Sequence, residues 1–512
     1  MDLARRVGRH WLFGLVLVGA LALRVLAVLA FRPIMWFGGD SASYLATGLR
    51  LVPDPGRVGG YGFMLWALRP LHGPGVHALA VLAAVQHVMG LAMGVLIYRL
   101  ARRYGLPAWV ATLAAIPVLF DAYELQLESD ALPDIPFGFL VVLALYLVLR
   151  SPGERRFAAT AAAAFLLGVS ALLWPPGLVL LAVLLAALLI GLLVRRVGMV
   201  AVLAAVVAGA LPVAGYSAWF SSHYHQFSLT SSDGVYLYSR TMSFADCAVI
   251  KPPPGERPLC PPPGQEKAPR KAASLYIWDT GSPLYALPGG RFTARNNRLA
   301  LHFALRAIAA QPAGYAAAAG HDVALSFYWK RPVHPDAAIV DRYQFADATT
   351  VWDPARTPTR GGGTVAGDQA LYNNGHPAPT RAVQPYARWL VTYQKYVFLP
   401  GTLLGVILLA GLAVMVIRRR HRPGGAGLAW AFAVTIVVVP PLVADFDLRY
   451  LVPVVPVACL AAALAFAPRA ARSDQRRWTT SAAATGTVPV PAEEPTRSLP
   501  SASTPTAGPE SA

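Results

Sequence analysis

The sequence predicts an α-helical polytopic membrane protein with about ten transmembrane helices and one extracytoplasmic insert of mixed α/β structure. Hydrophobic residues make up 55% of the 512 residues and charged residues only 14%, which is too apolar for a soluble chain of this length. Apolar runs long enough to cross about 30 Å of hydrocarbon recur along the chain. Arginine clusters also alternate with acidic or apolar connections, as expected for a chain that crosses a membrane repeatedly.

Ten apolar segments are predicted to span the membrane. They cover residues 11–31, 77–98, 108–123, 132–150, 157–174, 177–194, 197–219, 397–417, 428–445 and 450–467. The fifth and sixth segments are short for two spans, but Trp174-Pro175-Pro176-Gly177 between them is a strong turn signal. We therefore predict a tight hairpin of two helices there.

The arginine clusters predict the orientation, because basic residues in short loops mark the cytoplasmic side. Every second connection carries them: Arg5, Arg6 and Arg9; Arg99, Arg102 and Arg103; Arg150, Arg155 and Arg156; Arg195 and Arg196; Arg418, Arg419, Arg420 and Arg422; Arg469, Arg472, Arg476 and Arg477. Ten helices with both termini in the cytoplasm satisfy this pattern. Much of the net charge of +18 lies in these clusters, where it sets orientation and meets anionic lipid, so nucleic-acid binding is not expected.

The predicted spans divide the chain into four regions. Residues 1–219 form an N-terminal transmembrane bundle, whose first outer loop (32–76) we expect to be catalytic. Residues 220–396 form an extracytoplasmic soluble domain, and residues 397–467 form the C-terminal transmembrane helices. Residues 468–512 are rich in Ser, Thr, Pro and Ala, which predicts a disordered cytoplasmic tail. The excess of arginine over lysine is typical of GC-rich bacteria, so a bacterial plasma membrane is expected.

The insert carries three local signals. Gly234 to Ser239 is strand-like, and residues 295–310 and 313–329 predict two helices separated at Pro312. Cys247 and Cys260 bracket a proline-rich section. Outside the cytoplasm these cysteines can form a disulfide, which would contribute about 3 kcal/mol by constraining the unfolded chain; two free thiols are the alternative.

Asp40 is the first candidate for chemistry, in the sequence GGDSASY directly after the first apolar segment. One interpretation is a helix N-cap, since Asp before Ser41 and an apolar-periodic stretch is a common helix start. The other is a general base, because a partly desolvated carboxylate has a raised proton affinity that suits accepting a proton from a hydroxyl. The two roles are compatible with each other.

A second group of acids follows the third apolar segment. It consists of Asp121, Glu124, Glu128, Asp130 and Asp134. Glu124 and Glu128 are four residues apart, which places them on one face of a helix. Such acids could bind a divalent cation or activate an acceptor, and a solvated loop is the alternative. Their spacing matches no specific metal motif.

A third candidate is DFDLRYLVPVVP, residues 445–456, at the outer end of the last span. Arg449 could hold a phosphate or carboxylate through its planar fork, and Tyr450 adds a hydroxyl and an interfacial ring. The alternative is an ion pair of Arg449 with Asp445 or Asp447 and a tyrosine of the aromatic belt. The chain contains no phosphate-binding P-loop and no HExxH metal motif, which argues against ATP-driven transport by this chain alone.

These segments together resemble the glycosyltransferase C superfamily. Within it, the chain is similar to bacterial relatives of protein O-mannosyltransferases and lipid A aminoarabinose transferases. The resemblance rests on four places: Asp40 with Tyr44, Gly60 to Phe63, Glu124 to Ser129, and Arg449-Tyr450 with Pro453 and Pro456. The sequence departs from the family at Ser41, where many relatives carry a second acid, and at Gly62, where a GYP-type segment has proline.

The resemblance implies an inverting transfer of a sugar from a polyprenyl-phosphate donor to an acceptor hydroxyl at the outer membrane face. Asp40 would be the general base, and Arg449, Arg57 and Lys395 are candidates to stabilise the departing phosphate. Further substrate contacts are expected from Tyr44, Tyr61, Glu124, Glu128 and Tyr450, the two glutamates either binding sugar hydroxyls or holding a divalent ion. The acceptor would be a glycan, a lipid or a protein.

Two other functions fit the same composition. A polytopic transporter or lipid flippase would also be basic on its cytoplasmic side, and a non-catalytic envelope-assembly protein could keep the fold without the activity. Transporters commonly carry broken helices near the membrane midplane and inverted repeats. Here the acids gather at the outer edge and one large insert interrupts the helices, which favours chemistry at the surface.

Overall fold

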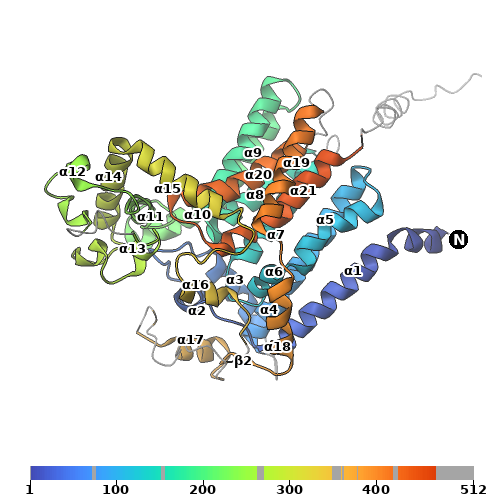
Figure 1. The fold of residues 1–512 in the computed structure, drawn as a ribbon, viewed down its shortest axis with the longest axis horizontal. Coiled ribbons are helices and arrows are strands. Elements are labelled where there is room, and N and C mark those ends of the chain that lie inside the picture. The colour runs from blue at the N-terminus through green and yellow to red at the C-terminus, as the bar shows by residue number, and fades with distance from the viewer. Residues whose placement is uncertain are drawn as a thin grey trace, which may run out of the picture. The chain divides into compact units, whose positions relative to one another are not determined.

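All ten predicted apolar segments are helical in the computed structural model (Figure 1). The structure describes residues 2–71, 77–150, 156–261, 270–346, 348, 359, 362–376, 379–418 and 425–468. The apolar helices are α1 (Asp2–Ala30), α4 (Ala78–Arg103), α5 (Ala108–Phe120), α7 (Asp134–Arg150), α8 (Arg156–Leu173), α9 (Pro176–Leu193), α10 (Met199–Tyr224), α19 (Gly401–Ile417), α20 (Ala426–Val443) and α21 (Val454–Phe466). The tail predicted for residues 468–512 lies, beyond Pro468, outside the described residues.

The membrane character of the chain is confirmed, but the count of ten spans is not. Among the described residues, six helices are long and apolar enough to cross a membrane, or up to eight if two bent pairs are each one span. In these pairs α5 bends by 54° into α6 (Ala122–Glu128), and α18 (Tyr386–Tyr396) bends by 52° into α19. Helix α5 has only 13 residues, about 20 Å at 1.5 Å per residue, and so is too short to cross alone.

The helix bundle is packed around α21, the last predicted span. Of the candidate span Leu448–Phe466, 83% is buried within the protein, against 22% of His10–Ala30. Helix α21 packs on α4, α5, α7, α19 and α20. On the outside of the bundle large apolar side chains such as Trp11 and Val207 are exposed, as expected of a lipid-facing surface.

The insert between α10 and α19 begins with a group of helices, of which those up to residue 310 share their own apolar core. These are α11 (Asp233–Thr241), α12 (Cys247–Ile250), η3 (Arg257–Leu259), α13 (Leu275–Trp278), η4 (Pro283–Ala286), α14 (Ala294–Ala310) and α15 (Pro312–Leu325). The two helices predicted on either side of Pro312 correspond to α14 and α15. Figure 1 shows α11, α13 and α14 grouped beside the bundle, with α15 leading back to α20.

The strand predicted at Gly234 to Ser239 is wrong, because this segment is helix α11. Its buried residues Val235, Tyr238 and Met242 recur at helical spacing and pack in one cluster with residues of α14. Packing on a neighbouring helix has overridden the strand preference of valine and tyrosine. The mixed α/β character predicted for the insert is likewise not confirmed: its described residues contain only the two-residue strand β2 (Arg381–Ala382).

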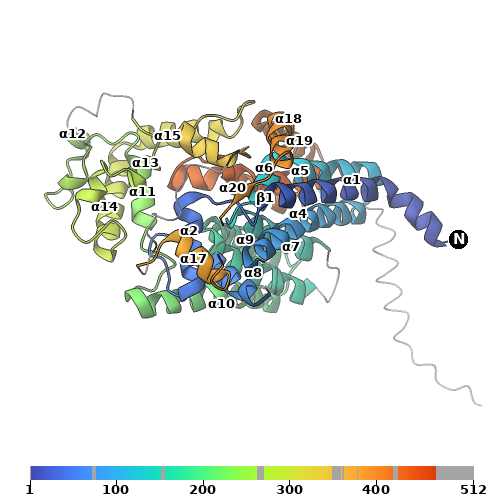
Figure 2. The same cartoon turned by 90° about the horizontal axis from the view of Figure 1, so that it is seen from below.

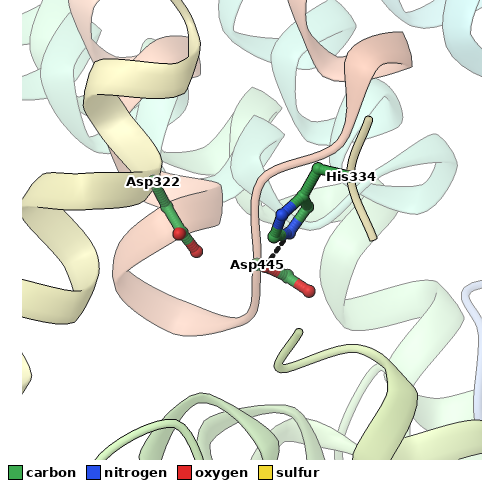
Figure 3. A group of neighbouring side chains, drawn as sticks. All are labelled: Asp322, His334 and Asp445. Atoms are coloured by element: carbon green, nitrogen blue, oxygen red, sulfur yellow. Dashed lines mark hydrogen bonds and ion pairs between the residues drawn. The ribbon is translucent and has the colours of Figure 1, made fainter. Parts of the chain in front are cut away.

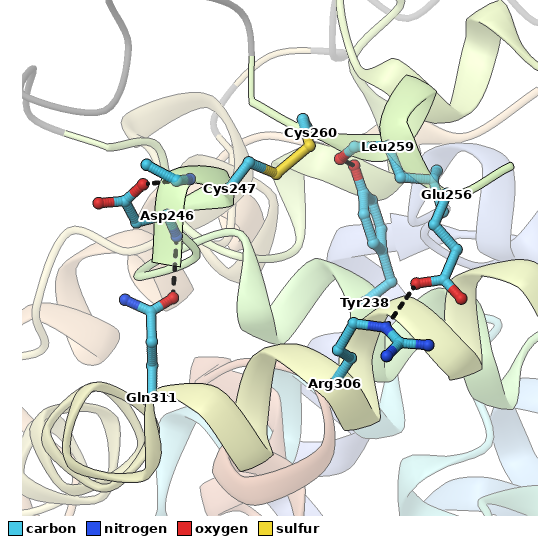
Figure 4. Close-up of a disulfide and its surroundings, with 9 residues drawn as sticks. Tyr238, Asp246, Cys247, Glu256, Leu259, Cys260, Arg306 and Gln311 are labelled. Carbon is cyan, nitrogen blue, oxygen red and sulfur yellow. Dashed lines mark hydrogen bonds and ion pairs between the residues drawn. A yellow bond between two sulfur atoms is a disulfide. The ribbon is translucent and has the colours of Figure 1, made fainter. Parts of the chain in front are cut away.

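A disulfide joins Cys247 to Cys260, with 6.0 Å between the Cα atoms (Figure 4). The loop that it closes is also held by side chains of the helices. Tyr238 donates a hydrogen bond to the carbonyl oxygen of Leu259 (2.8 Å), and Arg306 pairs with Glu256 (3.2 Å). The disulfide thus belongs to the scaffold of the insert, at the pair of cysteines that the sequence favours.

The remaining elements cover one end of the bundle. They are β1 (Phe31–Arg32), α2 (Gly38–Arg50), α3 (Gly60–Leu68), η1 (Arg69–Leu71), α16 (Ala337–Val340), η5 (Asp341–Tyr343), α17 (Val365–Tyr372) and η7 (Leu448–Leu451). Strands β1 and β2 pair antiparallel, Phe31 opposite Ala382. Arg50 forms a bidentate ion pair with Asp368 (2.9 and 2.5 Å), which ties α17 to α2. Figure 2 shows α2 and α17 side by side.

A buried ion cluster lies inside the bundle. Glu128, fully buried, accepts hydrogen bonds from Arg24 of α1 (2.6 Å) and is bonded to His87 of α4 (2.8 Å). Gly90 is required beside it, because a Cβ at that position would lie 1.8 Å from Oε1 of Glu128. The cluster joins three segments of the bundle, and separating its charges in a buried environment is costly.

We expect Gly90→Ala to destabilise the protein by about 1–3 kcal/mol or more, because the added methyl group forces Glu128 away from Arg24 and His87. The measurement is the thermal unfolding midpoint of the purified protein in detergent. Gly215→Ala in α10 is the matched control, since a Cβ there meets no atom within 4 Å. An unchanged midpoint for Gly90→Ala would contradict the structural role of the cluster.

Candidate functional site

Asp40 lies in the first turn of α2, where its carboxylate faces two arginines. The N-cap of α2 is Phe37, so Asp40 does not cap this helix. Asp40 forms ion pairs with Arg57 and with Arg449, the latter at 2.9 Å between Nη1 and Oδ2. Gly38 allows this helix start, because it has a φ of +50° and a Cβ there would lie 3.0 Å from Arg342. The first loop and the start of the last span thereby meet at one carboxylate.

The raised proton affinity predicted for Asp40 is wrong. Burial alone would raise the pKa of this carboxyl, but the charges of Arg57 and Arg449 outweigh it and hold the pKa below the ordinary value. The side chain of Asp40 is 15% exposed, so the two guanidinium groups act on it with little screening by water. In this state Asp40 is an ionised carboxylate that is fully engaged by cations.

Three further acids surround this group. The Nε atom of Arg449 is 4.0 Å from both Asp134 and Asp447, and Asp447 accepts a hydrogen bond from the hydroxyl of Tyr343 (2.8 Å). Asp130 accepts one from Gln126 (2.5 Å). Burial raises the pKa of Asp130 to about 8 and also raises that of Asp447, so that these groups favour their neutral forms more than ordinary aspartates do.

Several polar atoms of this region are buried without a hydrogen-bond partner among the described residues. They are Oδ2 of Asp134, Oε1 of Gln126 and Nε of Arg449. Unpaired buried polar atoms are costly and rare in folded proteins. These two acceptors and one donor therefore have unused hydrogen-bonding capacity in the region of the acids around Arg449.

Aromatic rings form the walls of the site. Arg57 lies 4.6 Å from the centre of the Trp278 ring, and Arg449 lies 5.3 Å from that of Phe37. Tyr450 stacks on Trp174, with ring centres 4.7 Å apart. Such walls hold the cations in place and exclude water, which strengthens electrostatic interactions within the site.

Four predicted site residues are brought together, namely Asp40, Arg57, Arg449 and Tyr450. Tyr44 is buried next to them on α2 and contacts Tyr61 edge to face, with ring centres 5.3 Å apart. Tyr61 itself is fully buried and donates a hydrogen bond to Gln86 (2.6 Å). Tyr44 therefore lies next to the site on the same helix as Asp40, whereas the hydroxyl of Tyr61 is engaged within the bundle.

The remaining three predicted residues lie elsewhere. Glu128 is engaged by Arg24 and His87, as described above. Glu124 is buried in α6, and neither of its carboxylate oxygens has a hydrogen-bond partner among the described residues. Lys395 lines a separate hollow of about 170 Å³ together with Lys330 and Arg331. Among the hydrogen bonds and ion pairs of the described residues, none joins these three side chains to Asp40.

One group of side chains within the described part of the chain has ligand atoms close enough for a metal ion (Figure 3). Asp322 of α15, His334 and Asp445 each offer one ligand atom, all within 4.8 Å of one another. His334 bonds to Asp445 (2.7 Å), and Arg240 donates to Asp322. Because Arg240 already supplies a cation and only three ligands are present, one short of a structural zinc site, we interpret the group as an ionic link between the insert and the end of α20.

Sequence reasoning did not single out Trp278 and Phe37, on which the two arginines stack. It also named Asp134 and Asp447 only as members of acidic segments. An acidic residue at the first position of an apolar helix, such as Asp134 at the start of α7, is a sequence signal by which a site residue of this kind can be found. Nothing in the local sequence distinguishes Trp278 from the other tryptophans, because its role depends on how the insert folds back over the first loop.

No family model and no curated protein matches the sequence. Among solved structures, the chain is similar to the protein O-mannosyltransferase Pmt1-Pmt2 complex of S. cerevisiae bound to its sugar donor, with 16% identity and a TM-score of 0.32. The match covers 46% of this chain and 36% of that one. The chain is also similar to the oligosaccharyltransferase AglB of Archaeoglobus fulgidus in complex with an inhibitory peptide and a dolichol-phosphate, with 14% identity and a TM-score of 0.37. This match covers 94% of this chain and 53% of that one.

ArnT from Cupriavidus metallidurans, bound to undecaprenyl phosphate, is similar at 14% identity and a TM-score of 0.35, over 94% of this chain and 81% of that one. The O-mannosyltransferase and ArnT are of the kinds that the sequence resemblance named. The chain spans about half or less of the yeast and archaeal chains. Because every TM-score is below 0.5, conclusions about activity rest on the site itself.

The lowered pKa of Asp40 predicts how stability depends on pH. Its ionised form favours the folded protein at neutral pH, and this contribution is lost as the pH falls below the unfolded value of about 3.9 and through the folded pKa. The thermal unfolding midpoint of Asp40→Asn should therefore lie furthest below that of the wild type near pH 7, and the gap should narrow toward about pH 3. Asp341→Asn, at an exposed position, is the control. A gap that widens on acidification would indicate a raised pKa instead.

Proposed function

We propose that this protein transfers a sugar from a polyprenyl-phosphate donor to an acceptor hydroxyl at the outer face of a bacterial plasma membrane, with inversion at the anomeric carbon. The observation that carries the proposal is the single carboxylate of Asp40 held between Arg57 and Arg449. A base for the acceptor and cations for a phosphate leaving group are the two things this reaction requires. The arginine pattern supports an orientation with both termini in the cytoplasm.

In this mechanism Asp40 accepts the proton of the acceptor hydroxyl. The acceptor oxygen then attacks the anomeric carbon while the bond from that carbon to the phosphate oxygen breaks. The polyprenyl phosphate departs with the bonding electrons, and Arg449 and Arg57 stabilise its charge. The open acceptors on Asp134 and Gln126 are suited to hydrogen bonds from sugar hydroxyls, which hold the sugar between base and leaving group.

The arginines also couple the two halves of the reaction. Without donor, both cations lower the proton affinity of Asp40, and the carboxylate is a poor base. A donor phosphate competes for the same guanidinium groups, because arginine binds phosphate and carboxylate through the same fork of N–H donors. Asp40 then loses part of its cationic stabilisation and its pKa rises toward the range useful for a general base. Base activation therefore follows donor binding.

We expect Asp40→Asn to lower the transfer rate by about 100-fold or more, because the amide cannot accept the proton of the acceptor. The assay uses purified protein in lipid, polyprenyl-phosphate sugars and an envelope extract as the source of acceptor. Asp341→Asn, at an exposed position, should retain activity. Equal transfer by wild type and Asp40→Asn would remove Asp40 from the mechanism. Absence of transfer from any donor would favour the transporter or envelope-assembly alternative.

Arg449 gives an independent test of the leaving-group role. We expect Arg449→Gln to lower kcat by about 100-fold or more and Arg449→Lys to lower it by about tenfold, since lysine keeps the charge but loses the fork geometry. Arg298→Gln, an exposed position on α14, is the charge-matched control. Steady-state kinetics with a purified donor separates kcat from KM. A rise in KM alone, with kcat unchanged, would assign Arg449 to ground-state binding.

A further inference from the structure

A second hollow lies between the insert and the first loop, outside the Asp40 site. It has a volume of about 640 Å³, and its lining includes Pro55, Gln226, Ser231, Tyr285, Arg291 and Thr293. Hydroxyl and amide side chains alternate with rings in this lining. None of the lining residues is acidic, and Arg291 is the only charged one among them.

Arg291 has no anionic partner among the residues that the structure describes. Its guanidinium lies over three rings, 4.9 Å from the centre of Trp278, 4.6 Å from that of Tyr285 and 5.0 Å from that of Phe292. Its Nε atom is buried and has no hydrogen-bond partner, and no carboxylate within the described ranges pairs with this arginine. Rings on several sides fix its orientation without neutralising its charge.

The backbone next to Arg291 also carries partial positive charge, because a helix begins there. Thr293 is the N-cap of α14, a helix of 17 residues, and Thr293 and Ala294 line the hollow. The start of a helix carries partial positive charge and free N–H groups that attract anions. An unpaired arginine and a helix start therefore act on the same hollow.

The hollow shares a wall with the Asp40 site. Pro55 accepts a hydrogen bond from the backbone N–H of Ser231 (2.7 Å), and Tyr224 donates one to Pro53 (2.8 Å), so the loop that carries Arg57 forms one side of the hollow. Trp278 lies within 5 Å of both Arg57 and Arg291. The two guanidinium groups are thus no more than about 10 Å apart, a separation that a short oligosaccharide can bridge.

We propose that this hollow is an acceptor subsite that recognises an acidic carbohydrate, through a carboxylate or phosphate group held by Arg291. The acidic group would lie a short oligosaccharide's length from the hydroxyl that Asp40 deprotonates. Gln226, Ser231 and Tyr285 offer hydrogen-bonding groups to the sugar hydroxyls. This inference rests on the proposed function for the meaning of the site, but the binding event that it describes is separate from transfer.

The test is calorimetric binding to the full-length protein in nanodiscs of zwitterionic lipid. The probes are trigalacturonic acid, the neutral trisaccharide obtained by reducing its carboxylates, and inorganic phosphate. We expect the acid to bind in a salt-sensitive way and the neutral form to bind about tenfold more weakly or worse. Phosphate that competes with the acid would show that Arg291 accepts either anion, and phosphate without effect would restrict the site to carboxylates.

Variants then assign the binding to the hollow. Arg291→Gln should weaken binding of trigalacturonic acid by about tenfold or more, Arg291→Lys should retain part of it, and Arg295→Gln, exposed on the same helix, should leave it unchanged. Thermal unfolding checks that each variant is folded. Equal binding of the neutral trisaccharide, equal binding by Arg291→Gln, or no binding of either anion would overturn the inference.

The inference and the proposed function can fail separately. If binding depends on Arg291 but no donor supports transfer, the subsite stands and the transferase proposal fails. If transfer proceeds and Arg291→Gln changes neither binding nor KM for the acceptor, the subsite is wrong and the transferase proposal stands.

Discussion

The arrangement of the site depends on one interaction, the pairing of Asp40 with Arg57 and Arg449. Arg57 comes from the first loop, and Arg449 comes from the start of the last span, 409 residues beyond Asp40. A buried carboxylate between two arginines is stable only if all three groups stay in place, because removing any one leaves an unpaired buried charge. Much of the structure around the site makes contacts that keep these three groups together.

Two layers of contacts hold the first loop. Arg50 at the end of α2 is fixed by Asp368 of α17, and the hydroxyl of Tyr372 in the same helix donates to the carbonyl of Leu65 in α3 (2.7 Å). On the other side, Trp278 of the insert lies against Arg57. The insert is in turn linked to the end of α20 through His334 and Asp445, two residues before Asp447. Contacts from several parts of the insert therefore hold the first turn of α2 and the loop after it in position.

The sequence predicts the helices well because apolar runs and proline-rich turns are local signals. It favours the Cys247–Cys260 disulfide that the structure contains, and it draws attention to Asp40 and Arg449, since each of these residues stands out from its immediate surroundings. The prediction fails at α11. Its valine and tyrosine residues are typical of a strand, but the segment is helical because one of its faces packs against α14. Local sequence does not reveal that Arg24 and His87 occupy the carboxylate of Glu128, because these partners come from α1 and α4. It does not reveal the positions of Trp278 and Arg291 either, because these depend on long-range contacts. Local patterns show which residues are unusual, and the fold decides which of them meet.

The charge balance of the site bears on the proposed binding of a phosphate, because acids outnumber arginines there. With all of them ionised, Asp40, Asp130, Asp134 and Asp447 would repel a phosphate. Burial raises the pKa of Asp130 to about 8 and raises that of Asp447, so these carboxyls contribute less negative charge than their number implies. Asp40 is the carboxylate that is paired with both arginines, whereas Asp134 and Asp447 lie 4.0 Å from Nε of Arg449. In the proposed reaction a phosphate that binds the two arginines displaces Asp40 from them, and the group that loses its cations is the group that would accept the proton.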